Sequence, residues 1–583
     1  MNKEQLEIRN EKLEANPHHI SRITYHASRT THQAFHPTQI IGLFIIAIGF
    51  GLRLYTLASE SLWYDELLQL DIAQGTLGMI FPRLRGHSAV PLDYLITHVW
   101  ILLGRSDGWV RVPAVMVGTL TLPVAYHFGR ALLGRRHGLL LMALLAIAPF
   151  HVRYSQEVRP YALVVLGVTL AGYGFWRLRQ TGRRRFFAPL QAGILISLLS
   201  HIFAAAIFVV LAIFTIFDFL LDRNRQRTIQ LLGTLIVSGL VPLLIFLAMG
   251  WGDVLLYTSK SFGEALVQPE RFTENIEVAD QVPGPTVDWP FIQDNIFAPF
   301  AATGEAVRLI FLNGLVLAGF VFLIVQKRTK QLFLLSLWLI IPPVLIIIFL
   351  IYRDTFFAPR YIIAMMPAYL LLLSAGILSA PYWVKQQKVA LSIMVILAGL
   401  VCLNYATSLN RYYRDTGKEN WRLVGDFIAA NSRPNDAVIA FRAEPTMNWY
   451  YPPAWTAPNF YVRLDDIQAA VAQADRSFVI LSLFSSGADA KVKAWLSEQQ
   501  AIRLVLDPAI HVYYLGNNVL PDQLLAEIQG FALPVNHALY ASLARENRRR
   551  PEVARQYYQL AINNAPDEAT RAAYQTALQA LRR

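Results

Sequence analysis

The chain has 583 residues, of which 55% are hydrophobic and only 16% are charged. This composition excludes an ordinary soluble protein, because the apolar residues gather into runs of about 20, enough to cross ~30 Å of hydrocarbon. The formal net charge of +12 does not indicate nucleic acid as a partner, since membrane proteins keep Lys and Arg in cytoplasmic loops as topological anchors. The sequence therefore predicts an α-helical polytopic membrane protein.

The first segment, residues 1–38, is polar and basic, and it lacks the short apolar core and small-residue cleavage site of a signal peptide. We expect it to form a cytoplasmic N-terminal tail. The apolar run 38–57 that follows is then an uncleaved first membrane span. The single cysteine, Cys402, excludes a disulfide within the chain.

Basic clusters along the chain predict the topology. They lie within 130–136, 177–185, 223–227, 327–330 and 385–388. The positive-inside rule places all of them on the cytoplasmic side, so an even number of spans must separate consecutive clusters. Apolar segments that fit this requirement are 138–152, 160–177, 186–200, 202–221, 229–250, 306–325, 332–351 and 361–380. With the first span, its return before Arg130 and a last span at 389–407, the sequence predicts about eleven crossings.

The apolar stretch 91–104 is the ambiguous element. It is short and carries Asp93 and His98, and a crossing here would put every later basic cluster outside. We expect a short amphipathic helix on the outer membrane surface instead.

The topology predicts four parts on the outer face: a first loop (59–109), a short loop (155–160), a large loop (251–305) and everything after residue 407. Residues 408–535 are expected to form a mixed α/β domain, with helices at 421–431 and 489–499 and buried strands at 437–441 and 478–484. The tail 536–583 is helical and similar to one tetratricopeptide (TPR) unit. A single unit cannot bury its own apolar face, so the tail is expected to pack on its neighbour or on a partner.

The first outer loop contains a carboxylate pair, Asp65 and Glu66, directly after the membrane exit. Such a pair is more often a solvated loop start or a helix cap. Two charges at this depth are costly when unpaired, however, and Trp63 and Tyr64 hold them at the interface, where aromatic belts lie.

Cations gather on the same predicted side. Six arginines lie at outer helix ends: Arg53, Arg111, Arg153, Arg159, Arg353 and Arg360; His87, His201 and Lys260 accompany them. A single such arginine usually covers apolar surface. A ring of them at one depth predicts an anionic, phosphate-bearing headgroup at the outer leaflet. A carboxylate beside a bound phosphate could deprotonate an acceptor hydroxyl or hold a divalent metal.

The order of these motifs resembles the membrane glycosyltransferases of the C class (GT-C), especially the protein O-mannosyltransferase-like group and the lipid A aminoarabinose transferases. The matching stretches are 52–55, 63–66, 87–94, 110–114, 149–162, 200–201, 359–361 and 420–421. Together they run from about residue 40 to about residue 440, all at the same predicted membrane level. The absence of a Gly-rich phosphate-binding loop agrees with a lipid-carried rather than a nucleotide-carried sugar.

The resemblance implies a GT-C transmembrane domain at 39–407 that transfers a sugar from a polyprenyl-phosphate carrier. The acceptor would be a hydroxyl of a glycan, lipid or protein at the outer face of the cytoplasmic (inner) membrane. Asp65 is the implied catalytic base, with Glu66 assisting. The donor phosphate would be bound by Arg53, Arg111, Arg159, His201, Arg360 and Tyr361. A divalent metal, Mg or Mn, could be held by Asp65, Glu66, His87 and Glu157.

Two other functions compete with this interpretation. A lipid-linked substrate transporter or flippase would carry polar residues near mid-membrane, whereas the charges here gather at the outer boundary. A membrane scaffold with a TPR-like partner-binding tail would not need so many spans.

Overall fold

The computed structural model describes residues 37–84, 90–248, 287–353, 357–414, 418–441, 443–451, 464–482, 488–507, 509–516, 527, 540–541, 544–545, 551–563, 565 and 568–581. Residues 1–48 form one compact unit and residues 49–583 a second. Helix α3 (Pro37–Leu54) begins in the first unit, and all other described elements belong to the second. The predicted tail 1–38 and most of the large loop 251–305 lie outside the described residues.

In the described part of the chain, eight helical segments are long and apolar enough to cross a membrane. They contain α7 (Asp107–Leu132), α10 (Tyr161–Thr181), η2 (Ile202–Ala205) with α12 (Ala206–Asp222), α13 (Arg225–Ala248), α19 (Ala306–Val325), α20 (Thr329–Arg353), η4 (Pro359–Met365) with α21 (Met366–Leu378) and α22 (Ala380–Trp383), and α23 (Gln387–Arg414). Short helices α17 (Trp289–Ile292), η3 (Gln293–Phe297) and α18 (Ala298–Ala301) precede α19. The chain is therefore a multi-pass membrane protein, as predicted.

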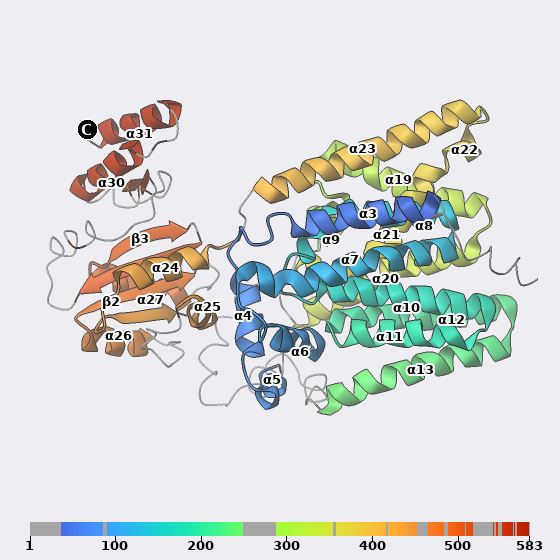
Figure 1. Ribbon diagram of the computed structural model, residues 1–583, viewed down its shortest axis with the longest axis horizontal. Coiled ribbons are helices and arrows are strands. Elements are labelled where there is room, and N and C mark those ends of the chain that lie inside the picture. Colours follow the sequence, from blue (N-terminus) through green and yellow to red (C-terminus); the bar gives the residue numbers. More distant parts are fainter. Residues whose placement is uncertain are drawn as a thin grey trace, which may run out of the picture. The chain divides into compact units, whose positions relative to one another are not determined.

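Three predicted spans form shorter helices: α3, α8 (Arg135–Ile147) and α11 (Phe187–Leu198), the last preceded by η1 (Arg184–Phe186). Helix α8 stops before Pro149, which lacks an N–H and starts α9 (Pro149–Tyr154). Together with the eight longer segments, these helices account for the predicted membrane segments. Figure 1 shows α7, α10, α11 and α13 in one layer of the bundle; α7 contacts α10, α10 contacts α11, and both α11 and α12 contact α13.

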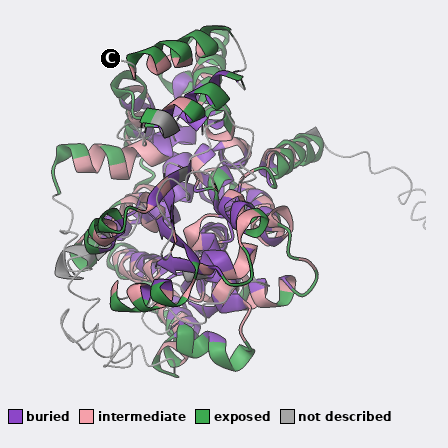
Figure 2. Cartoon of the chain, turned by 90° about the vertical axis from the view of Figure 1, so that its left-hand side faces the viewer, coloured by how far each residue is buried: buried purple, intermediate pink, exposed green. Residues whose placement is uncertain are grey.

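The span that contains η4 and α21 is the centre of the bundle. In its most apolar stretch of 18 residues, 94% of the residues are buried. The corresponding share for the span formed by α23 is 22%, so that span is peripheral. Figure 2 shows this contrast, with buried residues in the interior and exposed residues on the outer helices. Against α21, α19 packs so closely that a Cβ on Gly376 would lie 1.9 Å from the carbonyl oxygen of Leu315. Small residues at such contacts let membrane helices approach backbone to backbone.

The first outer loop contains three short helices, α4 (Tyr64–Ala73), α5 (Leu77–Arg83) and α6 (Pro91–Trp100). They pack together through Ile72, Ile80, Leu84 and Tyr94. With 10 residues, α6 is too short to cross a bilayer. The structure thus agrees with the prediction that residues 91–104 do not form a span.

The outer domain is built on a four-stranded sheet, shown in orange in Figure 1. Its elements in chain order are α24 (Trp421–Asn431), β1 (Ala437–Phe441), α25 (Glu444–Tyr450), α26 (Leu464–Gln473), β2 (Arg476–Ser482), α27 (Ala488–Glu498), β3 (Ile502–Asp507) and β4 (Ile510–Gly516). The strand order is β1-β2-β4-β3, with β1 and β2 parallel and the other pairs antiparallel. The mixed α/β domain was predicted, but α25, α26, β3 and β4 were not.

The sheet is covered on both faces, because alternate residues of each strand point to opposite sides. On one face, Val438 and Phe478 pack in a core that contains Trp421 and Ile428 of α24. On the other, Ile439, Phe441, Val479 and Leu481 pack with α26 and α27. Tail helices α30 (Pro551–Asn563) and α31 (Glu568–Ala580) pack on each other, and α30 joins the α24-side core. The tail thus packs on its neighbour.

Candidate active site

The carboxylate pair lies at the start of a helix. Trp63 is the N-cap of α4, and Asp65 and Glu66 lie in its first turn. Negative charge here is favourable, because the first N–H groups of a helix have no partner within the helix and carry partial positive charge. The backbone N–H of Trp63 is donated to Glu66 Oε2 at 3.4 Å, and that of Tyr64 to Glu419 Oε2 at 3.3 Å.

Asp65 lies between two arginines from distant segments. Its Oδ2 is 3.1 Å from Nη2 of Arg360, at the start of η4, and 3.9 Å from Nη2 of Arg159, in the loop before α10. Arg159 Nη1 also donates to the backbone carbonyl of Asp65 at 3.2 Å. The three side chains are 21%, 19% and 11% exposed, in the order Asp65, Arg360, Arg159, so the carboxylate is shielded but still reachable.

Aromatic rings surround this contact. The guanidinium of Arg360 lies 5.6 Å from the ring centre of Trp63 and 5.7 Å from that of Tyr361. The ring of His201 lies 5.8 Å from that of Tyr361. We call Asp65, Arg159, His201, Arg360 and Tyr361 the Asp65 cluster. All five were predicted as site residues, and the structure brings them together.

Several polar atoms at this site lack a hydrogen-bond partner within the described part of the chain. They are Trp63 Nε1, Arg159 Nε, His201 Nε2 and Arg360 Nε, all buried. Buried polar groups are nearly always paired in folded proteins, so several orphans at one place indicate a position for a polar ligand. Because the arginine and tryptophan atoms are donors, they suit an anionic group.

Glu66 points away from this cluster and is completely buried. Its oxygens accept from Arg111 Nε at 2.9 Å and Arg111 Nη2 at 2.6 Å, and from the N–H of Val158 at 2.9 Å. Burial raises the pKa of Glu66, but the charges of Arg111 and Lys418 and these hydrogen bonds outweigh it and hold the pKa at about 2. The carboxylate is therefore ionised and its oxygens are occupied. This geometry favours a positioning role for Glu66 over the expected catalytic one.

The structure places Arg53 and Arg111, which were expected to bind the donor phosphate, among backbone carbonyls. Arg53 is completely buried and donates to the carbonyls of Gly49, Leu145 and Ala146, with His151 Nδ1 at 2.7 Å from its Nη2. Arg111 is 2% exposed and also donates to the carbonyls of Leu57, Glu60 and Ser61. Both guanidinium groups are enclosed because they satisfy backbone oxygens where helices break.

Comparisons with known proteins indicate which fold the chain has. Residues 88–251 match the family model described as dolichyl-phosphate-mannose-protein mannosyltransferase. The crystal structure of ArnT from Cupriavidus metallidurans in the apo state is similar, with a TM-score of 0.54 and 12% identity over 81% of this chain and 97% of that one. The chain has the fold of the C-class membrane glycosyltransferases. The resemblance drawn from its motifs is confirmed.

Two further solved structures show similarity to this GT-C chain. ArnT from Cupriavidus metallidurans bound to undecaprenyl phosphate aligns with a TM-score of 0.53 and 12% identity, over 82% of this chain and 98% of that one. The archaeal oligosaccharyltransferase AglB from Archaeoglobus fulgidus, in complex with an inhibitory peptide and a dolichol-phosphate, has a TM-score of 0.48 and 11% identity, over 76% and 69%. No curated protein sequence matches the chain.

The predicted metal ligands do not form one group in this GT-C structure. The described residues contain no set of three His, Cys, Asp or Glu side chains placed to hold a metal ion. Glu157 is buried 3.6 Å from Lys418 and 3.4 Å from Arg153, and Glu66 is occupied by Arg111. These carboxylates therefore do not fit a metal site with Asp65. His87, Lys260 and the side chain of Arg353 lie outside the described part of the chain.

A second buried carboxylate, which the sequence indicated only as a charge in α6, lies near the Asp65 cluster. Asp93 is 8% exposed, and Gln69 Nε2 donates to it. Burial raises the pKa of Asp93 to about 6, against the lowering effects of the Gln69 hydrogen bond and the charge of Arg159. Burial thus holds the pKa of this carboxyl group above its ordinary range.

Sequence reasoning missed the residues that follow α23. Lys418 contacts Glu66, Glu419 accepts from the N–H of Tyr64, and Arg422 pairs with Asp107 at 3.0 Å through Nε. One signal could have indicated them. Charged residues crowd 418–422, directly after the last span and at the same membrane level as Asp65.

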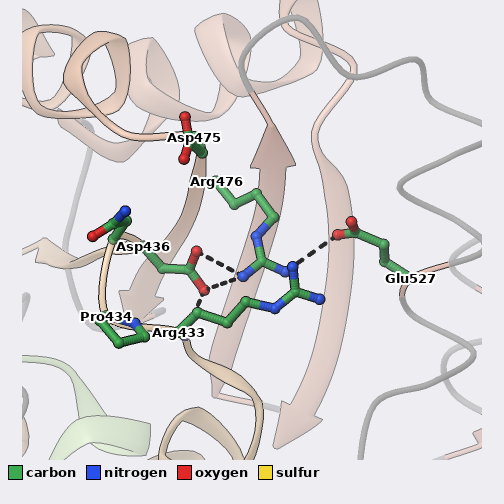
Figure 3. Close-up of a pocket in the computed structure, with 7 residues that line it drawn as sticks. Arg433, Pro434, Asp436, Asp475, Arg476 and Glu527 are labelled. Atoms are coloured by element: carbon green, nitrogen blue, oxygen red, sulfur yellow. Dashed lines mark hydrogen bonds and ion pairs between the residues drawn. The ribbon is translucent and has the colours of Figure 1, made fainter.

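The outer domain of this GT-C chain has a cavity of its own, of about 560 Å³ (Figure 3). It is lined by Arg433, Pro434, Asn435, Asp436, Asp475, Arg476 and Glu527. Figure 3 shows the guanidinium of Arg476 between two carboxylates, with Asp436 at 2.8 Å and Glu527 at 3.4 Å. The charge of Arg476 is thus compensated within the cavity wall, and none of the predicted site residues lines it.

Proposed function

We propose that this membrane glycosyltransferase moves a sugar from a polyprenyl phosphate to an acceptor hydroxyl, with Asp65 as the catalytic base. One observation carries the proposal: a shielded carboxylate lies in direct contact with two arginines whose Nε donors are unpaired. A base and an anion site within one contact suit a reaction in which an alcohol attacks and a phosphate leaves. The undecaprenyl phosphate in the similar ArnT structure and the dolichyl-phosphate-mannose family match support this donor class.

In the proposed reaction, Asp65 accepts the proton of the acceptor hydroxyl while the acceptor oxygen bonds to the anomeric carbon. The bond between that carbon and the phosphate oxygen breaks, and the phosphate leaves with the electron pair. Arg159 and Arg360 stabilise the negative charge that develops on it. Attack opposite the leaving group inverts the anomeric configuration.

The other members of the Asp65 cluster would orient the donor. Tyr361 and His201 lie beside Arg360 and present ring faces and a polar atom, a combination that suits a sugar attached to a phosphate. Trp63, whose ring also lies beside Arg360, contributes an indole N–H. No step is assigned to a metal ion; among the described residues, no three His, Cys, Asp or Glu side chains are placed to hold one.

We also propose that the enzyme lies in the cytoplasmic (inner) membrane with its N-terminus inside and the outer domain outside. The positive-inside rule supports this orientation, since the basic clusters fall at one set of helix ends. Acceptors that reach Asp65 from the outer side would include glycans, lipids and proteins. A transporter or scaffold role has no comparable observation in its favour.

A donor panel tests the proposed function. The full chain, reconstituted in lipid vesicles, is incubated with radiolabelled polyprenyl-phosphate sugars and a membrane extract that supplies acceptors. We expect release of free polyprenyl phosphate with at least one donor, together with label in an acceptor. Movement of intact donor across the vesicle membrane, without release of polyprenyl phosphate, would instead establish transport.

A further inference from the structure

The outer domain holds the backbone of the loop that precedes Asp65. The N–H of Leu62 is donated to Tyr450 Oη at 2.9 Å, and the N–H of Arg422 to Ser61 Oγ at 3.1 Å. Arg422 Nη2 donates to the carbonyl of Glu60 at 3.2 Å. The loop is therefore fixed by residues that lie far beyond it in the sequence, after the last membrane span.

Lys418, at the beginning of this outer segment, contacts three carboxylates. Its Nζ lies 3.6 Å from Glu157 Oε1, 3.7 Å from Glu66 Oε2 and 3.9 Å from Glu60 Oε2. The side chain is only 7% exposed, and both Glu66 and Glu157 are 0% exposed. A cavity of about 10 Å³, close to the size of one water molecule, adjoins it. The ammonium group is thus enclosed.

The three carboxylates come from different parts of the chain. Glu60 belongs to the loop after α3, Glu66 to the first turn of α4, and Glu157 to the loop between α9 and α10. Ionised carboxylates taken out of water repel one another unless a cation compensates them. Arg111 compensates Glu66, and Glu157 has one oxygen without a hydrogen bond in the described structure, while its other oxygen contacts both Arg153 and Lys418. Lys418 therefore joins the segment from Glu60 to Glu66 to the loop between α9 and α10.

These two loops carry the base and one phosphate-binding arginine. Glu66 adjoins Asp65 in the sequence and accepts the N–H of Val158, which adjoins Arg159. Arg159 in turn donates to the carbonyl of Asp65 at 3.2 Å. Glu66 and Glu157 thus lie in the two segments whose spacing sets the distance between the carboxylate of Asp65 and the guanidinium of Arg159.

We propose that Lys418 is a positioning residue, which sets the spacing between Asp65 and Arg159 by holding Glu66 and Glu157 together. The proposal rests on the proposed function for its effect on the reaction rate. Lys418 does not touch the Asp65 cluster and acts only through the two glutamates. The outer domain thereby becomes part of the catalytic unit, since the segment that carries Lys418 also holds the loop before Asp65.

Kinetics of Lys418→Met and Lys418→Arg test this role. Misplacement of reacting groups by about 1 Å can cost about 100-fold in rate. We expect kcat of Lys418→Met to fall by about 10- to 100-fold, with KM for the donor changed less than about 2-fold. Lys418→Arg keeps the charge and reach and should recover most of the rate.

Lys388→Met, at the exposed opposite end of α23, is the matched control. A kcat in Lys418→Met within about 2-fold of the wild type would overturn the proposal.

Hydrogen exchange gives a readout that does not depend on activity. In the full chain, peptides that cover 58–70 and 155–162 should exchange faster in Lys418→Met than in the wild type or in Lys388→Met. Unchanged exchange in both peptides contradicts the proposal. If the wild type transfers no sugar, the proposed function fails, while this measurement still decides whether Lys418 holds the two loops.

A milder variant covers the case in which Lys418→Met does not fold. Glu157→Gln keeps the shape of the side chain and removes one of the charges that Lys418 contacts. We expect faster exchange in 155–162 and a kcat about 3- to 10-fold lower, with an unchanged donor KM. Wild-type exchange together with wild-type kcat in this variant would also overturn the proposal.

Discussion

Oδ2 of Asp65 lies 3.1 Å from Nη2 of Arg360. This ion pair joins the first turn of α4 to the start of η4. The two residues belong to the first outer loop and to the most buried membrane span of the chain. A carboxylate that can take a proton and a guanidinium that can hold a phosphate are thus placed in one contact. The proposed reaction requires this proximity.

Replacing Arg360 by alanine should weaken donor binding. Hydrogen bonds to charged groups contribute about 1.5–3 kcal/mol, so we expect KM for the polyprenyl-phosphate sugar to rise by about 10- to 100-fold. Titration of donor in the reconstituted enzyme measures this. Arg308→Ala, which removes an exposed ion pair with Glu305, is the control and should leave KM unchanged. An unaltered donor affinity in Arg360→Ala would remove Arg360 from the phosphate site.

The buried pair of Arg111 and Glu66 should stabilise the fold. Arg111→Met leaves the Glu66 carboxylate buried without its bidentate partner, which we expect to cost about 3–5 kcal/mol in the free energy of unfolding. Unfolding of the purified protein in detergent measures the change. The double variant Glu66→Gln/Arg111→Met should regain part of the loss, because the unpaired charge is gone. Equal stability of Arg111→Met and wild type would contradict this account of the pair.

Asp93 should make stability depend on pH. Its pKa in the folded protein is about 6, above the ordinary value of 3.8. The unfolded chain therefore loses this proton at lower pH than the folded chain, so stability falls as pH rises from about 4 to about 6 and stays lower above that. Asp93→Asn should be more stable than wild type at pH 7.5, by on the order of 3 kcal/mol, and equal at pH 3.5.

Melting curves of wild type, Asp93→Asn and Asp465→Asn across this pH range check the prediction. Asp465 is an exposed residue of α26 and serves as the control. The stability difference between wild type and Asp93→Asn should appear only above about pH 4. A difference that is the same at all pH values would show that Asp93 does not titrate as described.

The contact between α19 and α21 should not tolerate a side chain at Gly319. A Cβ there would lie 2.2 Å from the carbonyl oxygen of Leu372, whereas a Cβ on Gly314 of the same helix meets nothing within 4 Å. We expect Gly319→Val to abolish accumulation of folded protein and Gly314→Val to have little effect. Size-exclusion profiles of the two variants in detergent distinguish them. Similar profiles would mean that the helices can move apart without loss of the fold.

The membrane-spanning helices could be predicted because their main determinant is local. Hydropathy indicates where a segment can span. The helix α6 was correctly kept out of the spans because Asp93 and His98 interrupt a short apolar run. The helix that contains the predicted last span is longer than the hydrophobic run, since α23 continues to Arg414 as a polar helix.

The Asp65 cluster was predictable in membership but not in geometry. Its residues share one membrane level, which placed them near one another. The same argument included Arg53 and Arg111, because sequence position does not show whether a guanidinium faces a site or the carbonyls of a broken helix. Lys418 was missed because its three carboxylate contacts depend on how the segment after the last span folds back onto the first loop, which sequence position does not show.

The most direct test of the central claim is sugar transfer by Asp65→Asn. The substitution removes the base while keeping the size of the side chain, so membrane insertion and donor binding should persist. With the donor that the wild type uses, we predict that release of polyprenyl phosphate falls by about 1,000-fold or more. Asp465→Asn should transfer at the wild-type rate. Transfer by Asp65→Asn at a rate close to that of the wild type would contradict the assignment of Asp65 as the base.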